Sequence, residues 1–156
     1  MRLHRRFLAG RAQAFPRLTT EDTLGAFPRG GLRVLLIQAP IREWSYPNIA
    51  PLGQQYVAAS AWMDGHDVRI LDLNAERRGP IEVDERFHHW VERRVLWALD
   101  AHDPHVVGLG GIITQYATIR RIARLVRAAC PEVPIILGGG IASCLPRFMA
   151  ERLPVD

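Results

Sequence analysis

Four short apolar runs alternate with segments of helical periodicity from residue 33 onward. The apolar runs cover residues 33–38, 68–72, 105–110 and 134–137. Apolar side chains also recur every three or four positions over residues 52–63, 83–98, 119–126 and 143–153. Short apolar runs joined by helices are typical of parallel strands that are buried on both faces. The pattern predicts an α/β domain built on a doubly wound parallel sheet.

The first apolar run is followed by a long loop, residues 39–51, which contains three prolines and two aromatic residues. Prolines restrict the backbone, so this loop has a defined shape. In doubly wound sheets, ligands bind beyond the carboxyl ends of the strands. We therefore expect the functional site where this loop meets Asp72 and Asn74, after the second run, and the glycines 138–140, after the fourth.

Residues 1–31 show no sustained periodicity and end in Pro28-Arg29-Gly30-Gly31, which is typical of a leader or linker. Residues 1–33 carry seven arginines against two acidic residues, whereas residues 34–156 carry thirteen against fourteen. The formal charge of +4 therefore reflects the leader, and the distribution does not indicate a nucleic-acid partner. We expect a basic leader over residues 1–31 and one binding domain over residues 32–156.

Cys130 and Cys144 are too few and too far apart for a disulfide framework or an iron–sulfur cluster. We interpret them as buried or half-buried thiols of a cytoplasmic protein. His88 and His89 are adjacent in a predicted helix and cannot face one metal ion together. No apolar run approaches the roughly eighteen residues of a membrane span, so neither a membrane partner nor a metal ligand is expected.

The motifs of several common ligand classes are missing from the predicted strand ends. The first strand is followed by neither G-x-G-x-x-G, for a dinucleotide, nor G-x-x-x-x-G-K-[ST], for a nucleoside triphosphate. It also lacks the hydroxyl-rich loop of a flavin mononucleotide site and the acidic pair of a response regulator. These absences leave a bulky ligand that is held mostly by backbone and shape.

Seven short motifs follow one another over residues 33–156. They are Val34-Leu35-Leu36-Ile37 with Pro40, Asn48-Ile49-Ala50-Pro51-Leu52-Gly53 with Tyr56, Gly65-His66-Asp67-Val68, Asp72-Leu73-Asn74, Asp103-Pro104-His105-Val106-Val107-Gly108, Thr114 with Tyr116, and Pro131 through Gly138-Gly139-Gly140. Together they resemble the cobalamin-binding domain of the cobalamin-dependent radical S-adenosylmethionine (SAM) enzymes.

The resemblance implies a flavodoxin-like, or Rossmann-like, fold with five parallel strands in the order 2-1-3-4-5. Val155 and Asp156 would then be the first residues of the fifth strand. We therefore expect the domain to be incomplete at its C-terminus, and the chain to be a fragment or truncated product of a longer protein.

The resemblance also implies that the corrin ring of cobalamin lies over the carboxyl ends of the strands and that its nucleotide tail is buried in the domain. Residues 48–53 would lie under the ring, residues 110–116 would bind the tail, chiefly through Thr114, and residues 138–140 would let the tail pass close to backbone. The expected cofactor-binding residues are Trp44, Tyr46, Asn48, Ile49, Ala50, Pro51, Leu52, Gly53, Asp72, Asn74, Gly110, Gly111, Ile112, Thr114, Tyr116, Gly138, Gly139, Gly140 and Ile141.

The chain departs from other cobalamin domains in lacking D-x-H-x-x-G, the motif that gives a histidine to cobalt, after the first strand. His66 precedes the second strand, at the wrong end of the sheet. We expect cobalamin bound without its own base and without a protein histidine, with Trp44, Tyr46 or loop backbone against the lower face.

For the whole enzyme, the resemblance implies methyl transfer from SAM through cobalt and substrate activation by a radical made at a [4Fe–4S] cluster. This chain lacks CxxxCxxC, so a radical SAM domain would act in cis or in trans, SAM and the cluster would not bind here, and no catalytic residue is expected. Two alternatives remain: a standalone corrinoid carrier, and a flavodoxin-like module that binds another ligand or a protein.

Overall fold

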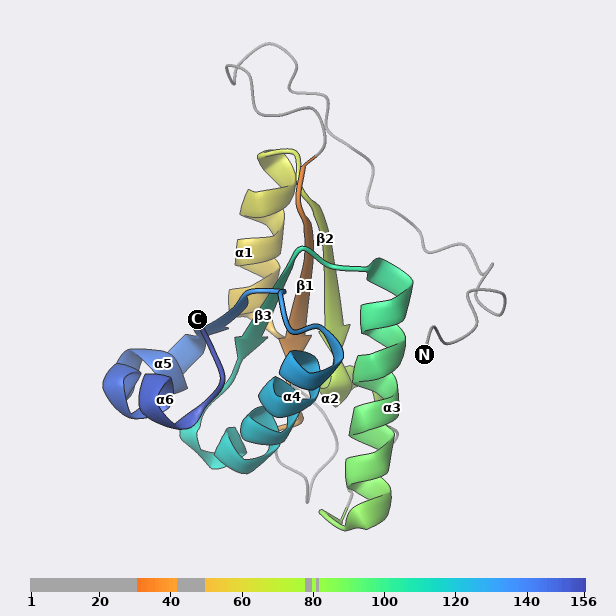
Figure 1. The fold of residues 1–156 in the computed structure, drawn as a ribbon, viewed down its shortest axis with the longest axis vertical. Coiled ribbons are helices and arrows are strands. Elements are labelled where there is room, and N and C mark those ends of the chain that lie inside the picture. Colours follow the sequence, from red (N-terminus) through yellow and green to blue (C-terminus); the bar gives the residue numbers. More distant parts are fainter. Residues whose placement is uncertain (1–30, 42–49, 78–79, 81) are drawn as a thin grey trace.

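The computed structural model describes residues 31–41, 50–77, 80 and 82–156, which form a four-stranded parallel sheet covered by helices (Figure 1). The sheet order is β2-β1-β3-β4, and the strands are β1 (Arg33–Gln38), β2 (Asp67–Asp72), β3 (Val106–Gly110) and β4 (Ile135–Gly138). This order is the first four strands of the expected flavodoxin-like arrangement, so the prediction of fold class is confirmed. The predicted strand bounds differ from these by one residue at most.

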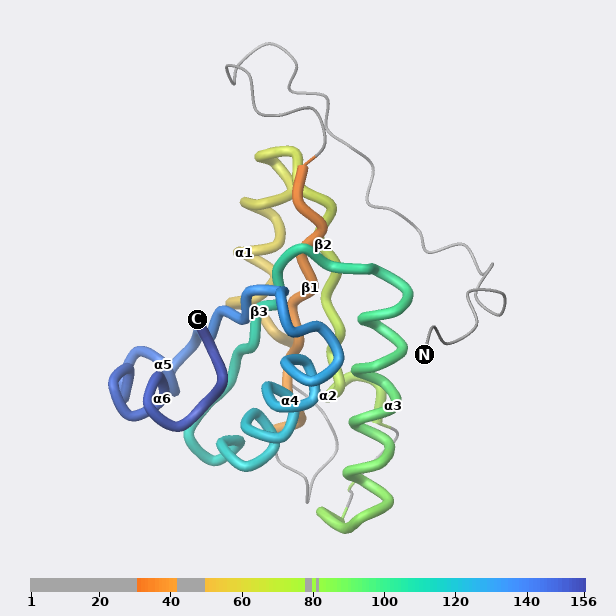
Figure 2. Tube along the Cα trace, viewed as in Figure 1, coloured from red at the N-terminus to blue at the C-terminus, as the bar shows by residue number. Residues whose placement is uncertain are grey.

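The longer helices lie on opposite faces of this sheet (Figure 1). Helix α1 (Leu52–Met63) packs against β1 and β2 on one face, while α3 (Glu85–His102) and α4 (Tyr116–Ala129) cover the other. The shorter helical segments are α2 (Leu73–Glu76), η1 (Ile113–Gln115), α5 (Gly139–Cys144) and α6 (Pro146–Arg152). The tube view places α5 and α6 beyond the β4 edge, away from α3 (Figure 2).

The hydrophobic core lies between the sheet and the pair α3 and α4. Alternate residues of the central strands, Leu35 and Ile37 in β1 and Val107 and Leu109 in β3, point into it because successive side chains of a strand face opposite sides. They meet helix positions spaced three and four residues apart, namely Phe87, Val91, Val95, Ala98, Leu99, Ile119, Ile122, Ala123 and Val126. Burial of each large apolar side chain contributes about 1.5–3 kcal/mol, so this half of the domain supplies most of its stability.

The opposite face of the sheet is much less covered. No residue of α1 is fully buried, and Tyr56 and Val57 are 77% and 57% exposed. On the same face, Ile136 in β4 is 56% exposed, although strand interiors in parallel sheets are usually covered. Helix α1 therefore shields β2 and β1 and leaves the surface over β3 and β4 open.

Two sequence expectations need correction. The helix predicted over residues 143–153 is two helices that meet at Leu145 and Pro146, because proline lacks an N–H and disfavours helical geometry in the residue before it. Cys144 is exposed rather than buried, whereas Cys130 is half-buried, and burial raises the pKa of its thiol. The leader, residues 1–30, and the loop segment 42–49 lie outside the described residues.

The last residues of the chain run along the outer edge of β4. The Asp156 N–H donates to the Ile135 carbonyl at 2.9 Å, and the Asp156 carboxylate accepts from the Ile135 N–H and from Arg127. These two hydrogen bonds hold the pKa of the Asp156 carboxyl below its ordinary value. The edge of β4 is where the fifth strand of a 2-1-3-4-5 sheet would pair.

Within the described part of the chain, no helix is both long enough and apolar enough to cross a membrane.

Candidate functional site

Four residues share one row across the sheet at the carboxyl ends of the strands. Gln38 in β1 pairs with Asp72 in β2 and with Gly110 in β3, and Gly110 pairs with Gly138 in β4. The parallel register therefore brings together three of the predicted site positions that are far apart in the sequence. The segments after these residues rim the same edge of the sheet.

A pocket of about 450 Å³ begins at this row and extends over the open face of the sheet beside α1. This volume is within the range of about 300–1,000 Å³ that is typical of small-molecule sites. Apolar side chains and glycines dominate the lining. The lining residues are Leu36, Gln38, Ile41, Pro51, Leu52, Gly53, Gln54, Val57, Gly108, Leu109, Gly110, Gly111, Ile112, Ile136, Gly138, Gly139 and Gly140.

The glycines 138–140 differ in what a side chain would meet. A Cβ built on Gly138 has no heavy atom within 4 Å, and one on Gly140 has only Ile112 at 3.9 Å. Gly139 instead has φ of +80°, and a Cβ there would lie 3.0 Å from the Gly111 carbonyl oxygen. Gly139 is thus required by its own backbone, whereas Gly138 and Gly140 leave open space that belongs to the pocket.

Gln115 holds two loops of the pocket together. Its side chain is 2% exposed, and its amide nitrogen donates to the carbonyls of Ala39 and Pro40 at 2.6 and 2.8 Å. Its amide oxygen accepts from the Ile112 N–H at 2.8 Å. Sequence reasoning missed this residue, because a lone glutamine in a loop carries no signal that it will be buried between two chain segments.

Asp72 and Asn74 have structural partners beside the site. The Asp72 carboxylate caps α2 by accepting from the N–H groups of Asn74 and Ala75. Asn74 is buried, and its side-chain oxygen accepts from the Ile41 N–H and from Arg77. Neither side chain lines the pocket described above, so their contact with a ligand stays a prediction.

The other predicted site residues fall into three groups. Pro51, Leu52, Gly53, Gly110, Gly111, Ile112 and Gly138–140 line the pocket. Ala50 and Thr114 are exposed near it, Tyr116 packs against Phe148, and Ile141 is buried in the core with its N–H bonded to Gly111. Trp44, Tyr46, Asn48 and Ile49 lie outside the described residues.

The described histidines lie away from the pocket. His88 and His89 belong to α3, on the other face of the sheet, and His66, His102 and His105 lie at the amino ends of the strands. Within the described residues, no charged side chain lines the pocket, and no group of three His, Cys, Asp or Glu could hold a metal ion.

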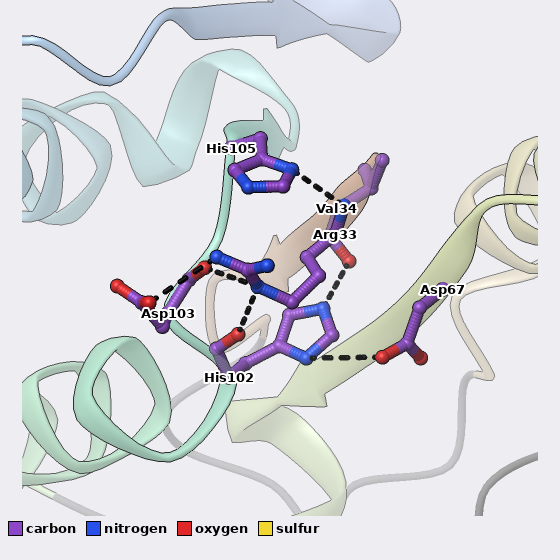
Figure 3. Close-up of polar contacts among 6 residues, drawn as sticks. All are labelled: Arg33, Val34, Asp67, His102, Asp103 and His105. Carbon is purple, nitrogen blue, oxygen red and sulfur yellow. Dashed lines mark hydrogen bonds and ion pairs between the residues drawn. The ribbon is translucent and has the colours of Figure 1, made fainter. Parts of the chain in front are cut away.

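The amino end of the sheet holds a different kind of cluster, centred on Arg33 (Figure 3). The Arg33 guanidinium donates to the carbonyls of His102 and Asp103, at 3.1 and 2.6 Å, and pairs with the Asp103 carboxylate. The Arg33 N–H donates to Nδ1 of His105 at 3.2 Å. This end of β1 is therefore tied to the end of α3 and to the chain entering β3.

His102 completes this cluster from the end of α3 (Figure 3). Its Nε2 lies 3.1 Å from the Val34 carbonyl, which can only accept, so Nε2 carries the proton. Burial lowers the pKa of His102; the Asp67 carboxylate, 3.9 Å from Nδ1, opposes the shift and Arg69 adds to it. The polar groups here are engaged with one another, as structural clusters usually are.

Comparison with known proteins identifies the family of this chain. A model of the B12 binding domain family matches residues 43–156. Cytidylyl-2-hydroxyethylphosphonate methyltransferase from Streptomyces wedmorensis is 28% identical over 112 residues, which cover 68% of this chain and 21% of that protein. The chain thus spans about a fifth of the length of this relative. Because the family model covers well over half of the chain, the chain belongs to the B12-binding domain family.

Proposed function

We propose that this domain binds cobalamin with its own base displaced and presents it for SAM-dependent methyl transfer. In this proposal the corrin ring lies at the row formed by Gln38, Asp72, Gly110 and Gly138, and the nucleotide tail enters the pocket beside α1. The observation that carries the proposal is the glycine-lined pocket, which opens at the carboxyl ends of the strands in a chain of the B12-binding family.

The pocket lining fits the tail of cobalamin. Gly138 and Gly140 leave space beside backbone, which a flat, bulky group can fill. The lining is mostly apolar and uncharged, which suits the aromatic base of the tail and removes its surface from water. Bound cobalamin supplies a cobalt centre that carries a methyl group.

The positions of the histidines support binding without a protein ligand to cobalt. The loop 39–53 contains no histidine in the sequence, and the described histidines lie at the other end or on the other face of the sheet. The lower face of the corrin would therefore meet Trp44, Tyr46 or backbone of this loop.

The relative's name, a methyltransferase, supports a role in methyl transfer. We propose that this chain works with a radical SAM domain, in cis or in trans, which binds SAM and a [4Fe–4S] cluster that this chain does not bind. Residues 1–31 would act as a basic leader to the binding domain of residues 32–156. The free thiols of Cys130 and Cys144 fit the reducing cytoplasm.

Incubation with hydroxocobalamin, followed by desalting and a visible spectrum, tests the proposal. We expect a retained corrinoid with the spectrum of a base-displaced form. Added free imidazole should change the spectrum, because no protein histidine occupies the lower face of cobalt. A protein that stays colourless, both as this chain and when extended by a fifth strand, would contradict cobalamin binding and favour the alternative of another ligand or a protein partner.

A further inference from the structure

Gln54 is a polar residue of the pocket that sequence motifs do not single out. It lies in the first turn of α1, and its side chain extends from the helix to strand β1 of the sheet. A Cβ built on Gly110 would lie 2.7 Å from its Nε2, so Gln54 occupies the space that a side chain at Gly110 would need. Glycine at position 110 therefore allows this glutamine to lie against β3.

The orientation of the Gln54 amide follows from its contact with β1. Its Nε2 donates to the Ile37 carbonyl at 2.9 Å. A backbone carbonyl can only accept a hydrogen bond, so the amide nitrogen must face it and the amide oxygen must point elsewhere. The amide nitrogen of Gln54 is thus used by the Ile37 carbonyl, and the amide oxygen is the atom left to accept a hydrogen bond from another group.

That acceptor has no partner. The Gln54 Oε1 atom has less than 1 Å² of accessible surface and forms no hydrogen bond with the residues that the structure describes, so a ligand donor reaches it only when the side chain turns toward the pocket. A buried amide oxygen without a donor is unfavourable, and such atoms are rare in folded proteins. Gln38, the other polar side chain of the lining, uses its amide nitrogen on the Ala39 carbonyl.

We propose that Gln54 recognises a hydroxyl group on the buried part of the ligand. This inference rests on the proposed function, in which the buried part is the nucleotide tail of cobalamin and the hydroxyl is that of its sugar. A hydroxyl can donate to Oε1, whereas the aromatic base and the phosphate of the tail carry no such donor. Gln54 is thereby a specificity residue that favours corrinoids with a nucleotide tail.

The test compares hydroxocobalamin with aquacobinamide, a corrinoid that lacks the nucleotide tail. Both dissociation constants are measured by spectral titration for the wild-type chain, for Gln54→Met and for Gln55→Met. Methionine keeps the length of the side chain but cannot form the hydrogen bond. Gln55 is the adjacent glutamine, is exposed and does not line this pocket, so Gln55→Met is a matched control.

We expect Gln54→Met to weaken hydroxocobalamin binding about tenfold relative to aquacobinamide, and Gln55→Met to leave the ratio unchanged. Loss of the bond to the Ile37 carbonyl would weaken the binding of both corrinoids equally. The melting temperature of the variant would show any accompanying loss of stability. An unchanged ratio in Gln54→Met would overturn the role of Gln54 while leaving the proposed function intact. A wild-type chain that binds neither corrinoid would overturn both.

Discussion

The two ends of the sheet are built from the same strands but serve different purposes. At the amino end, the side chains of Arg33 and His102 bond to backbone carbonyls, and Arg33 also pairs with the Asp103 carboxylate. At the carboxyl end, glycines replace side chains, and one buried amide oxygen has no partner within the described part of the chain. The difference indicates that the carboxyl end of the sheet is the incompletely packed end, where a bound ligand would fill the remaining space.

The contrast has a physical basis in the strand directions. All four strands are parallel, so every loop that follows a strand reaches the same edge, and every loop that precedes one reaches the other. The loops that precede β2, β3 and β4 are short, and Arg33, at the start of β1, bonds to the loop before β3. The following segments include Ile41, Pro51 and the glycines 138–140, which line the pocket.

The largest effect on hydroxocobalamin binding is expected for Gly138→Val, which places a side chain in the pocket at the carboxyl ends of the strands. The backbone of Gly138 is extended, with φ of −127°, so valine fits the conformation and the fold is retained. The side chain would occupy the pocket and cost about 1–3 kcal/mol of binding energy, or about 5- to 150-fold in the dissociation constant for hydroxocobalamin. Spectral titration measures this change.

The control for this variant is Ser143→Val, which places the same side chain on the exposed surface of α5. Equal affinities in the two variants, with both folded, would show that the space beside Gly138 is not part of the ligand site.

At the amino end, Arg33→Gln should reduce stability and spare binding. The substitution removes the bonds to two backbone carbonyls and to the Asp103 carboxylate, which contribute about 1.5–2 kcal/mol together at this half-exposed site. Urea denaturation measures the loss, with Arg124→Gln on the exposed face of α4 as the control. A clear fall in hydroxocobalamin affinity would mean that the two ends of the sheet are coupled.

His102 makes stability depend on pH at the amino end. Its pKa in the folded protein is below the ordinary 6.5, so the unfolded chain takes up the proton first as the pH falls. Stability is therefore present above about pH 6.5 and decreases below it, until the folded form is also protonated. One such group contributes a slope of at most about 1.4 kcal/mol per pH unit.

Urea denaturation at several pH values should show a smaller acid-side slope for His102→Asn than for the wild type. The same slope in both proteins would show that His102 is not the source of the acid sensitivity.

The smallest effect is expected for Asp72→Ala, which removes the cap of the short helix α2. Loss of such a cap costs about 1 kcal/mol, and Asp72→Ser should restore most of it because serine also caps helices. Thermal denaturation measures both variants. If serine does not recover the stability, the carboxylate has a role other than capping, and the hydroxocobalamin affinity of the serine variant then tests for a ligand contact.

Much of the fold could be predicted from periodicity alone. A strand that is buried on both faces, such as residues 33–38, is recognised by a continuous apolar run. An amphipathic helix, such as α3, is recognised by apolar residues every three or four positions, because only one of its faces is buried. The break between α5 and α6 was missed although Pro146 was visible, since the apolar repeat continues across it. Glycines 138–140 indicated close backbone approach, but not that Gly139 is needed for its own φ of +80°.

The hydrophobic pattern of the sequence predicted the α/β class and the edge of the sheet where a ligand is expected, because these depend on local repeats and on strand direction, while the strand order came from the resemblance to a known family. Only the tertiary structure decided which polar groups meet. Gln115 joins loops that lie 75 residues apart, and Gln54 bonds to β1 while its oxygen stays unpaired. Such pairings arise when distant segments pack together, and no local pattern records them.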